Sequence, residues 1–214
     1  MSSTEFGETS SPHLLVFAGP NGSGKSSVTV KIPTVGLYVN ADDIKRACGC
    51  TDLEAAQEAE KIRRLLLEKK KDFTFETVLS TDRNLDLLRE AKQAGYSIMA
   101  VFVLTRNPEI NVVRVQQRAE AGGHPVPEEK IRSRYTKSLG NLAALVRIAD
   151  RTMVLDNSGE KPELICEVRG NEVQIWEGAN WTKKEILALL AVKRSADTAA
   201  GIGQNRPRAE GMQK

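Results

Sequence analysis

A glycine-rich stretch near the start of the chain carries the residue types that bind phosphate. Gly19, Gly24, Lys25 and Ser26 stand at the spacing G-x-x-x-x-G-K-[ST]. Glycines let successive backbone N–H groups curl around phosphate oxygens, because no Cβ is in the way. Lys25 can then reach the β- and γ-phosphates, and the Ser26 hydroxyl is placed to ligate Mg²⁺. The sequence therefore predicts a nucleoside triphosphate site formed by Gly19, Pro20, Asn21, Gly22, Ser23, Gly24, Lys25, Ser26 and Ser27.

The segments on either side of this loop argue against the alternative of a plain glycine turn. Residues 14–18 (LLVFA) are continuously apolar, as in a strand that is buried on both faces. A short helix is predicted from Lys25, and Pro33 must end it. The N-terminus of that helix adds its positive dipole end to the same anion. Strand, loop and helix in this order are typical of a phosphate-binding loop.

Carboxylates are expected near the same edge of the sheet. Asp42 and Asp43 come just past a strand predicted at 37–40, and Glu76 lies on a strand predicted at 73–79. Open α/β sheets bind their ligands at the carboxyl ends of the strands. The acidic pair is therefore placed where a general base could face the terminal phosphate of a bound nucleotide.

A broken helical segment late in the chain carries arginines. A helix through Arg118 is interrupted at 121–127 (AGGHPVP), and residues 128–149 are helical again, bearing Arg132 and Arg134. Small-molecule kinases combine a base near the loop with a mobile arginine lid over the phosphates. The chain has neither an N-K-x-D guanine-recognition sequence nor an obvious Walker B strand after its central strand. The pattern therefore favours a kinase over a switch GTPase, a motor or an ATPase.

Strands that alternate with helices predict one α/β domain with a mostly parallel sheet. We expect a P-loop kinase-like three-layer sandwich of about five strands plus a small C-terminal β-hairpin. The predicted strands are 13–18, 37–40, 73–79, 97–104 and 151–156, with the hairpin at 163–168 and 172–176. The longest helical pattern, 52–71, has Asp52 as its predicted cap. The kinase domain is expected at 13–192, with a lid at about 114–135, a flexible arm at 1–12 and a disordered tail at 193–214.

Composition and charge exclude several classes. A formal net charge of +3 is too small to argue for nucleic-acid or membrane binding. No stretch approaches the ~20 apolar residues of a membrane span. Cys48, Cys50 and Cys166 form no metal-ligand set, and their odd number argues against a disulfide framework. We therefore expect free thiols and a cytoplasmic location.

Four segments resemble the zeta toxin family of toxin–antitoxin kinases. They are residues 18–26 (AGPNGSGKS), 38–44 (YVNADDI), 75–80 (FETVLS) and 118–127, within a similarity that covers roughly 14–157. The resemblance implies transfer of phosphate from ATP, with Mg²⁺, to the 3′-hydroxyl of the amino sugar in UDP-N-acetylglucosamine. It also implies a block of cell-wall precursor synthesis and a small helical antitoxin that covers the ATP site.

The resemblance assigns roles to individual residues. Asp42 falls on the catalytic base, for which a helix N-cap is the alternative role, and Asp43 is expected to be a cap or a partner of a Mg²⁺-bound water. Arg118 falls on the first lid arginine, which with Lys25 and Asp42 completes the catalytic set. The second lid arginine has no clear counterpart, because His124 stands near its place. The substrate side is expected to comprise Asp43, Glu76, Thr77, Arg83, His124, Arg132 and Arg134.

Two other interpretations stay open. The acceptor could be another small hydroxyl compound, such as an antibiotic or a nucleoside. In a different class, the chain could be a nucleotide-dependent binding or switch protein. Asp42 discriminates between the classes, because a kinase should lose phosphoryl transfer without it and still bind ATP.

Overall fold

The computed structural model of the chain describes residues 11–123 and 125–190. Its centre is a seven-stranded sheet with the order β2-β3-β1-β4-β5-β6-β7. Strands β1 to β5 run parallel, and β6 and β7 form an antiparallel hairpin at the sheet edge. The arrangement confirms the predicted α/β class with five parallel strands and a C-terminal hairpin. The strands are β1 (His13–Ala18), β2 (Leu37–Val39), β3 (Phe73–Thr77), β4 (Ser97–Leu104), β5 (Arg151–Asp156), β6 (Glu163–Arg169) and β7 (Glu172–Ile175).

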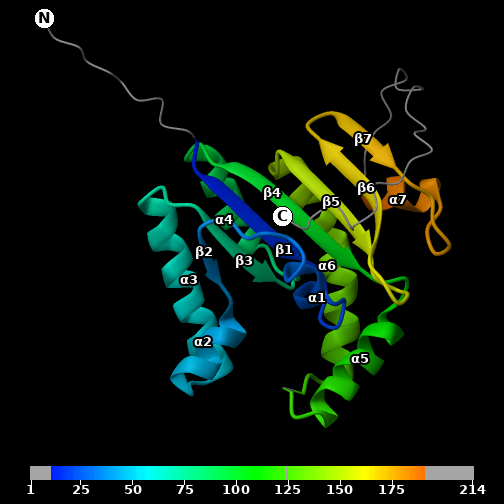
Figure 1. Cartoon of the computed structure of the whole chain (residues 1–214), viewed down its shortest axis with the longest axis horizontal. Helices are drawn as coiled ribbons and strands as arrows, with labels where there is room; N and C mark the ends of the chain where they lie inside the picture. The colour runs from blue at the N-terminus through cyan, green and yellow to red at the C-terminus, as the bar shows by residue number, and fades with distance from the viewer. Residues whose placement is uncertain (1–10, 124, 191–214) are drawn as a thin grey trace, which may run out of the picture.

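The helices cover the two faces of the sheet unequally. Side chains of α3, α4, α6 and α7 join the larger hydrophobic core on one face, and α1 packs on the other through Val28. Figure 1 shows α2 and α5 on either side of α1 at one end of the sheet. The described helices are α1 (Lys25–Thr29), α2 (Ala41–Cys48), α3 (Asp52–Glu68), α4 (Arg83–Gln93), α5 (Pro108–Glu120), α6 (Glu128–Ile148) and α7 (Lys183–Leu190).

Strand β1 lies inside the sheet because both of its faces are apolar. Leu14 and Val16 point into the larger core, while Leu15 and Phe17 join the smaller core beneath α1. Val16 pairs with β3 on one side and with β4 on the other. The loop that follows β1 therefore emerges between the carboxyl ends of β3 and β4, where parallel sheets place their ligands.

The cap of α3 differs from the predicted one. Thr51, not Asp52, is the N-cap: its hydroxyl accepts a hydrogen bond from the Glu54 backbone N–H, and the Glu54 carboxylate accepts one from the Thr51 N–H. This reciprocal capping box satisfies two backbone donors at once, which a lone aspartate cap cannot do. Asp52 instead forms an ion pair with Lys45 of α2.

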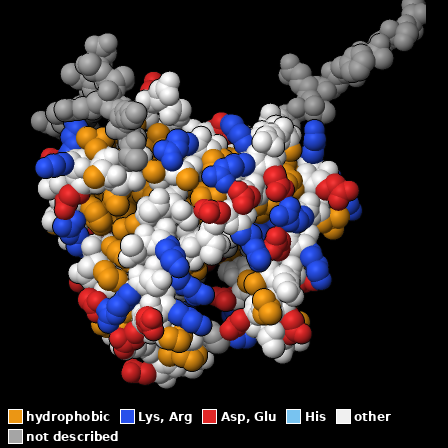
Figure 2. Space-filling view, turned by 180° about the vertical axis from the view of Figure 1, so that it is seen from behind, with side chains coloured by type: hydrophobic (Ala, Val, Ile, Leu, Met, Phe, Trp, Pro, Cys, Tyr) orange, Lys and Arg blue, Asp and Glu red, His pale blue; other side chains and the backbone are white. Residues whose placement is uncertain are grey.

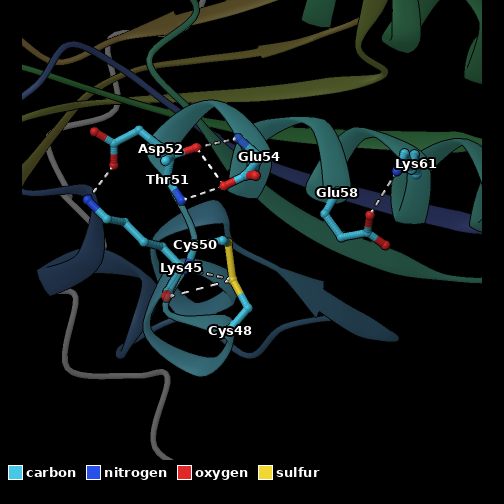
Figure 3. The surroundings of a disulfide bond; sticks show 8 residues. All are labelled: Lys45, Cys48, Cys50, Thr51, Asp52, Glu54, Glu58 and Lys61. Atoms are coloured by element: carbon cyan, nitrogen blue, oxygen red, sulfur yellow. Dashed lines mark hydrogen bonds and ion pairs between the residues drawn. A yellow bond between two sulfur atoms is a disulfide. The ribbon is translucent and has the colours of Figure 1, made fainter.

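The prediction that all three cysteines are free thiols is wrong for two of them. Cys48 and Cys50 are joined by a disulfide at the end of α2 (Figure 3). Gly49 between them adopts a left-handed backbone conformation with φ 65°, which reverses the chain and brings the flanking Cα atoms to 5.2 Å. That separation lies within the range a disulfide spans. Cys166, buried in β6, is the free thiol.

Several predicted segments lie outside the described residues. These are the N-terminal arm up to residue 10 and the whole tail at 193–214. Between 11 and 190, His124 alone is likewise not described. No helix of the described ranges is long and apolar enough to cross a membrane.

Candidate active site

The glycines of the loop occupy positions where a side chain does not fit. Gly19 has φ +142°, and a Cβ there would lie 2.0 Å from the carbonyl oxygen of Val103 in β4. Gly24, the N-cap of α1, has φ +86°, and a Cβ there would lie 2.1 Å from Nδ2 of Asn157. The loop is thus pressed against its neighbours, and glycine is required at both positions because a side chain there would clash.

Amide side chains from distant segments hold the loop. Asn157, directly after β5, donates from Nδ2 to the Ser23 carbonyl at 2.8 Å, and Asn111 of α5 donates to the Asn21 carbonyl at 2.6 Å. Both asparagines are buried. Arg114 of α5 in turn donates to the Asn157 carbonyl at 2.7 Å. Neither asparagine was predicted to contact the loop, because no local sequence pattern marks an amide whose partner is so distant in the chain.

The ammonium group of Lys25 folds back over the loop. Its Nζ donates to the carbonyl oxygens of Gly19 and Pro20 at 2.8 and 3.1 Å. Burial lowers the pKa of Lys25 from 10.5 to about 8, although the negative charges of Glu76 and Asp42 act in the opposite direction. Arg118 adds a smaller lowering effect on that pKa. Glu76, Asp42 and Arg118 therefore lie near enough to Lys25 for their charges to influence its pKa.

The hydroxyls of the loop divide into exposed and buried groups. Ser26 and Ser27, in the first turn of α1, are exposed. Ser23 is fully buried, and its Oγ has no hydrogen-bond partner among the described residues. The described residues contain no cluster of three or more His, Cys, Asp or Glu that could hold a metal. An exposed hydroxyl at the N-terminus of the loop helix is instead suited to share a metal with phosphate oxygens.

Asp42 leaves its carboxylate unused by the helix that carries it. The N-cap of α2 is Asn40, whose Oδ1 accepts a hydrogen bond from the Asp42 backbone N–H at 2.9 Å. The alternative role of Asp42 or Asp43 as the cap is therefore wrong, because the cap lies at the first polar residue after β2. Asp42 is exposed on the first turn of α2, and Asp43 pairs with Arg46 on the same helix.

Glu76 of β3 is held by two hydroxyl donors. Its Oε1 accepts hydrogen bonds from Oγ1 of Thr29 at 2.8 Å and from the phenol of Tyr38 at 2.7 Å. Thr29 closes α1, and Tyr38 lies on β2, so this carboxylate joins three elements. Neither donor was predicted. The alternation of an extended segment does place Tyr38 and Asn40 on the same side of the chain, so the sequence could have predicted that these two side chains lie close together.

The arginines and Thr77 separate into those at the loop and those elsewhere. Arg134 of α6 donates to Oδ1 of Asn21 at 3.3 Å, so it lies at the loop. Arg132 forms ion pairs with Glu109 and Glu128, and Arg83 forms one with Glu60. The buried Thr77 hydroxyl accepts hydrogen bonds from the Leu79 N–H and the Asn84 amide, and so holds the turn after β3. The described contacts of Arg83 and Arg132 are these ion pairs, whereas the Thr77 carbonyl also accepts a hydrogen bond from the Gly19 N–H of the loop at 3.2 Å.

Two hollows border this end of the molecule. Seen from behind in Figure 2, a gap rimmed by positive and negative side chains opens between the α5–α6 and α2–α3 ends. The other hollow, of about 440 Å³, lies beside the segment that follows β5. Its lining residues are Asp156, Gly159, Glu160, Lys161, Glu163, Ala179 and Asn180.

A family model described as Zeta toxin matches residues 31–179 of the chain. The matched segment contains Asp42, Glu76 and Arg118 and extends over more than half of the sequence. The chain belongs to the Zeta toxin family. The match begins after the glycine-rich loop, so the assignment of the loop rests on its own motif and geometry.

Individual relatives are distant in sequence. An uncharacterised protein of Haemophilus influenzae is 24% identical over 127 residues, which cover 56% of this chain and 91% of that protein. The matched chain of the AvrRxo1-ORF1:-ORF2 crystal structure with ATP has a TM-score of 0.63 at 16% identity, covering 78% of this chain and 61% of that chain.

A chain of the PezAT toxin–antitoxin system of Streptococcus pneumoniae has a TM-score of 0.55 at 16% identity, with coverage of 88% of this chain and 87% of that chain. At these identities the likeness shows the P-loop kinase-like fold. The present chain spans about three fifths of the matched AvrRxo1 chains.

Proposed function

We propose that this chain transfers the γ-phosphoryl group of ATP to a hydroxyl group of a nucleotide sugar, with UDP-N-acetylglucosamine as the first candidate. The observation that carries the proposal is the glycine-rich loop with Lys25 folded onto it, on the same short helix as Thr29, whose hydroxyl holds the Glu76 carboxylate. A phosphate-binding loop with a carboxylate held beside its helix and an arginine, Arg134, in contact with it supplies groups that phosphoryl transfer to an alcohol requires.

Each of these residues has a role that follows from its position. The loop N–H groups and Lys25 would bind the β- and γ-phosphates. Asp42, exposed on the first turn of α2, would orient the acceptor hydroxyl or accept its proton. Arg118 would stabilise charge on the transferring group, and Arg134, which already contacts Asn21, is the residue best placed to act as the second lid arginine.

The residues present fit a Mg²⁺ ion that is shared with the nucleotide. The exposed Ser26 hydroxyl would supply the protein ligand, and phosphate oxygens and water would supply the others. Bound there, the ion neutralises charge on the β- and γ-phosphates.

The proposed acceptor and antitoxin partner are supported by the family match and by the similar solved structures. Membership of the Zeta toxin family favours a nucleotide-sugar acceptor and a cytoplasmic site of action. The similarity to a chain of the PezAT toxin–antitoxin system supports an antitoxin partner, and we propose that it covers the ATP site. The AvrRxo1 structure with ATP supports ATP as the phosphoryl donor.

A coupled ADP-release assay tests the proposal. With ATP and Mg²⁺, we expect UDP-N-acetylglucosamine to stimulate ADP release by the wild-type protein. Asp42→Asn should lower that stimulated rate by about 10²–10⁴-fold and leave the Kd for ATP within about threefold, because the carboxylate acts on the acceptor. Asp86→Asn is the matched control, since Asp86 is an exposed carboxylate on α4 paired with Arg89.

The possible outcomes separate the function classes. Slow ADP release that ignores the sugar nucleotide would refute this acceptor and direct the search to antibiotics, nucleosides and other hydroxyl compounds. Equal loss of ATP binding and turnover in Asp42→Asn would contradict a kinase and favour a nucleotide-dependent switch.

A further inference from the structure

Glu76 is the point where the nucleotide side and the acceptor side of the site are joined. Thr29 donates to its Oε1 from the last residue of α1, the helix that carries Lys25. Tyr38 donates to the same oxygen from β2, the strand that leads to Asp42. Among the described residues, the second oxygen, Oε2, accepts no hydrogen bond. One oxygen is therefore fixed from two directions, and the other remains for a ligand.

The hydrogen-bond chain continues from Tyr38 to the helix of the candidate base. Asn40 donates from Nδ2 to the Tyr38 phenol oxygen at 3.1 Å. The Oδ1 of the same amide accepts from the Asp42 backbone N–H at 2.9 Å and caps α2. The amide of Asn40 thus uses both of its ends, and a continuous path runs from the Glu76 carboxylate to the first turn of α2.

We propose that Tyr38 is a positioning residue for the acceptor hydroxyl. It orients Glu76 and, through Asn40, fixes the position of Glu76 relative to Asp42. The inference rests on the proposed kinase function and adds a residue to it. Tyr38 reaches the acceptor through Glu76 and is not itself a catalytic group.

The electrostatics of the phenol agree with this role. Burial raises the pKa of Tyr38, and the hydrogen bond to Glu76 and the negative charge of that carboxylate raise it further. The phenol therefore keeps its proton at neutral pH and acts as a donor to Glu76. A phenylalanine at this position would keep the ring in place and remove only the hydroxyl donor. The Tyr38→Phe variant therefore tests the hydrogen bond to Glu76 by itself.

The decisive experiment is a double-mutant cycle on the acceptor reaction. Tyr38→Phe, Glu76→Gln and the double variant are compared with wild type in the ADP-release assay, with UDP-N-acetylglucosamine as the acceptor. Tyr38→Phe should lower kcat/KM for the acceptor by about tenfold to a hundredfold, the range for one hydrogen bond to a charged group. KM for ATP should stay within about twofold, because the loop contacts are untouched.

If Tyr38 acts through Glu76, its loss has little left to affect once Glu76 is changed. The double variant should then be no more than about threefold worse than Glu76→Gln alone. Asn40→Ser should show a smaller loss of the same kind, since serine still caps α2 but cannot reach the phenol. Tyr96→Phe is the matched control: its phenol donates to the Leu66 and Lys71 carbonyls, and its loss should change stability without changing kcat/KM.

Two results would overturn the inference while leaving the kinase intact. One is wild-type kinetics in Tyr38→Phe, and the other is multiplication of the two single losses in the double variant. A wild-type protein that shows no acceptor-stimulated release would instead remove the proposed function, and the inference with it. The wild-type control thus distinguishes the two failures.

Discussion

Replacing Lys25 by methionine should make the nucleotide-free protein more stable. Burial lowers the pKa of Lys25 from 10.5 to about 8, so the folded protein at pH 7 carries an ammonium ion that its surroundings disfavour. A pKa lower by about 2.5 corresponds to about 3 kcal/mol of folding free energy. Loss of the hydrogen bonds to the Gly19 and Pro20 carbonyls offsets about 1 kcal/mol of this. Lys25→Met should therefore raise the free energy of unfolding by about 2 kcal/mol at pH 7.

The pH dependence gives the sharper test, since Lys25 is protonated in both states at pH 7. Between pH 8 and 10.5 the unfolded chain still binds this proton while the folded chain releases it, so wild-type stability rises with pH over that window. The Lys25→Met variant lacks this contribution. The difference between the two proteins should therefore shrink by up to about 3 kcal/mol as the pH rises from 8 to 10.5.

Urea unfolding of both proteins at a series of pH values measures this difference directly, because other titrating groups cancel. Lys31→Met, at an exposed lysine just after α1, is the matched control and should leave the stability nearly unchanged. ATP with Mg²⁺ should stabilise wild type and Lys31→Met but not Lys25→Met. A Lys25→Met protein that is less stable than wild type at pH 7, or a difference that is constant with pH, would refute the reasoning.

Two further predictions concern the end of α2 and the start of α3. Thr51→Ala should lower the free energy of unfolding by about 1 kcal/mol, because the capping box with Glu54 is lost, and should leave kcat unchanged. Chemical unfolding and the ADP-release assay measure these two quantities. A loss of stability near zero would mean that solvent satisfies these backbone donors equally well. For the cysteines, a thiol-specific alkylating agent should label only Cys166 in the denatured, unreduced protein, and should label Cys48 and Cys50 only after reduction. Peptide mass spectrometry detects the labelled residues. Labelling of Cys48 without reductant would contradict the disulfide.

The parts of the site that were predictable are those whose chemistry fixes both residue type and spacing. The loop from Gly19 to Ser26 is one, because phosphate contact requires an uncovered backbone next to a lysine. The central strands are another, because a strand buried on both faces must be apolar throughout. The approximate placement of Asp42 and Glu76 followed from the rule that parallel strands end at a common edge.

What could not be predicted depends on side chains that meet across long sequence distances. Nothing near Asn157 or Asn111 indicates that each donates to the loop. Arg132 looked equivalent to Arg134 in sequence, yet two nearby glutamates hold the former while the latter reaches Asn21. The Thr51 cap was a different case, because the T-x-x-E spacing of Thr51 and Glu54 is visible in the sequence and is typical of a capping box.

The contacts made by Asn111 and Asn157 have a consequence for folding during synthesis. Their loop partners lie 90 and 134 positions earlier in the chain. During synthesis the phosphate-binding segment therefore leaves the ribosome long before the side chains that hold it in shape. Contacts of such range form late in folding. A nascent chain therefore contains the phosphate-binding sequence before the contacts that shape its loop can form. Under the proposed function, we therefore expect the chain to bind ATP only after translation has passed β5.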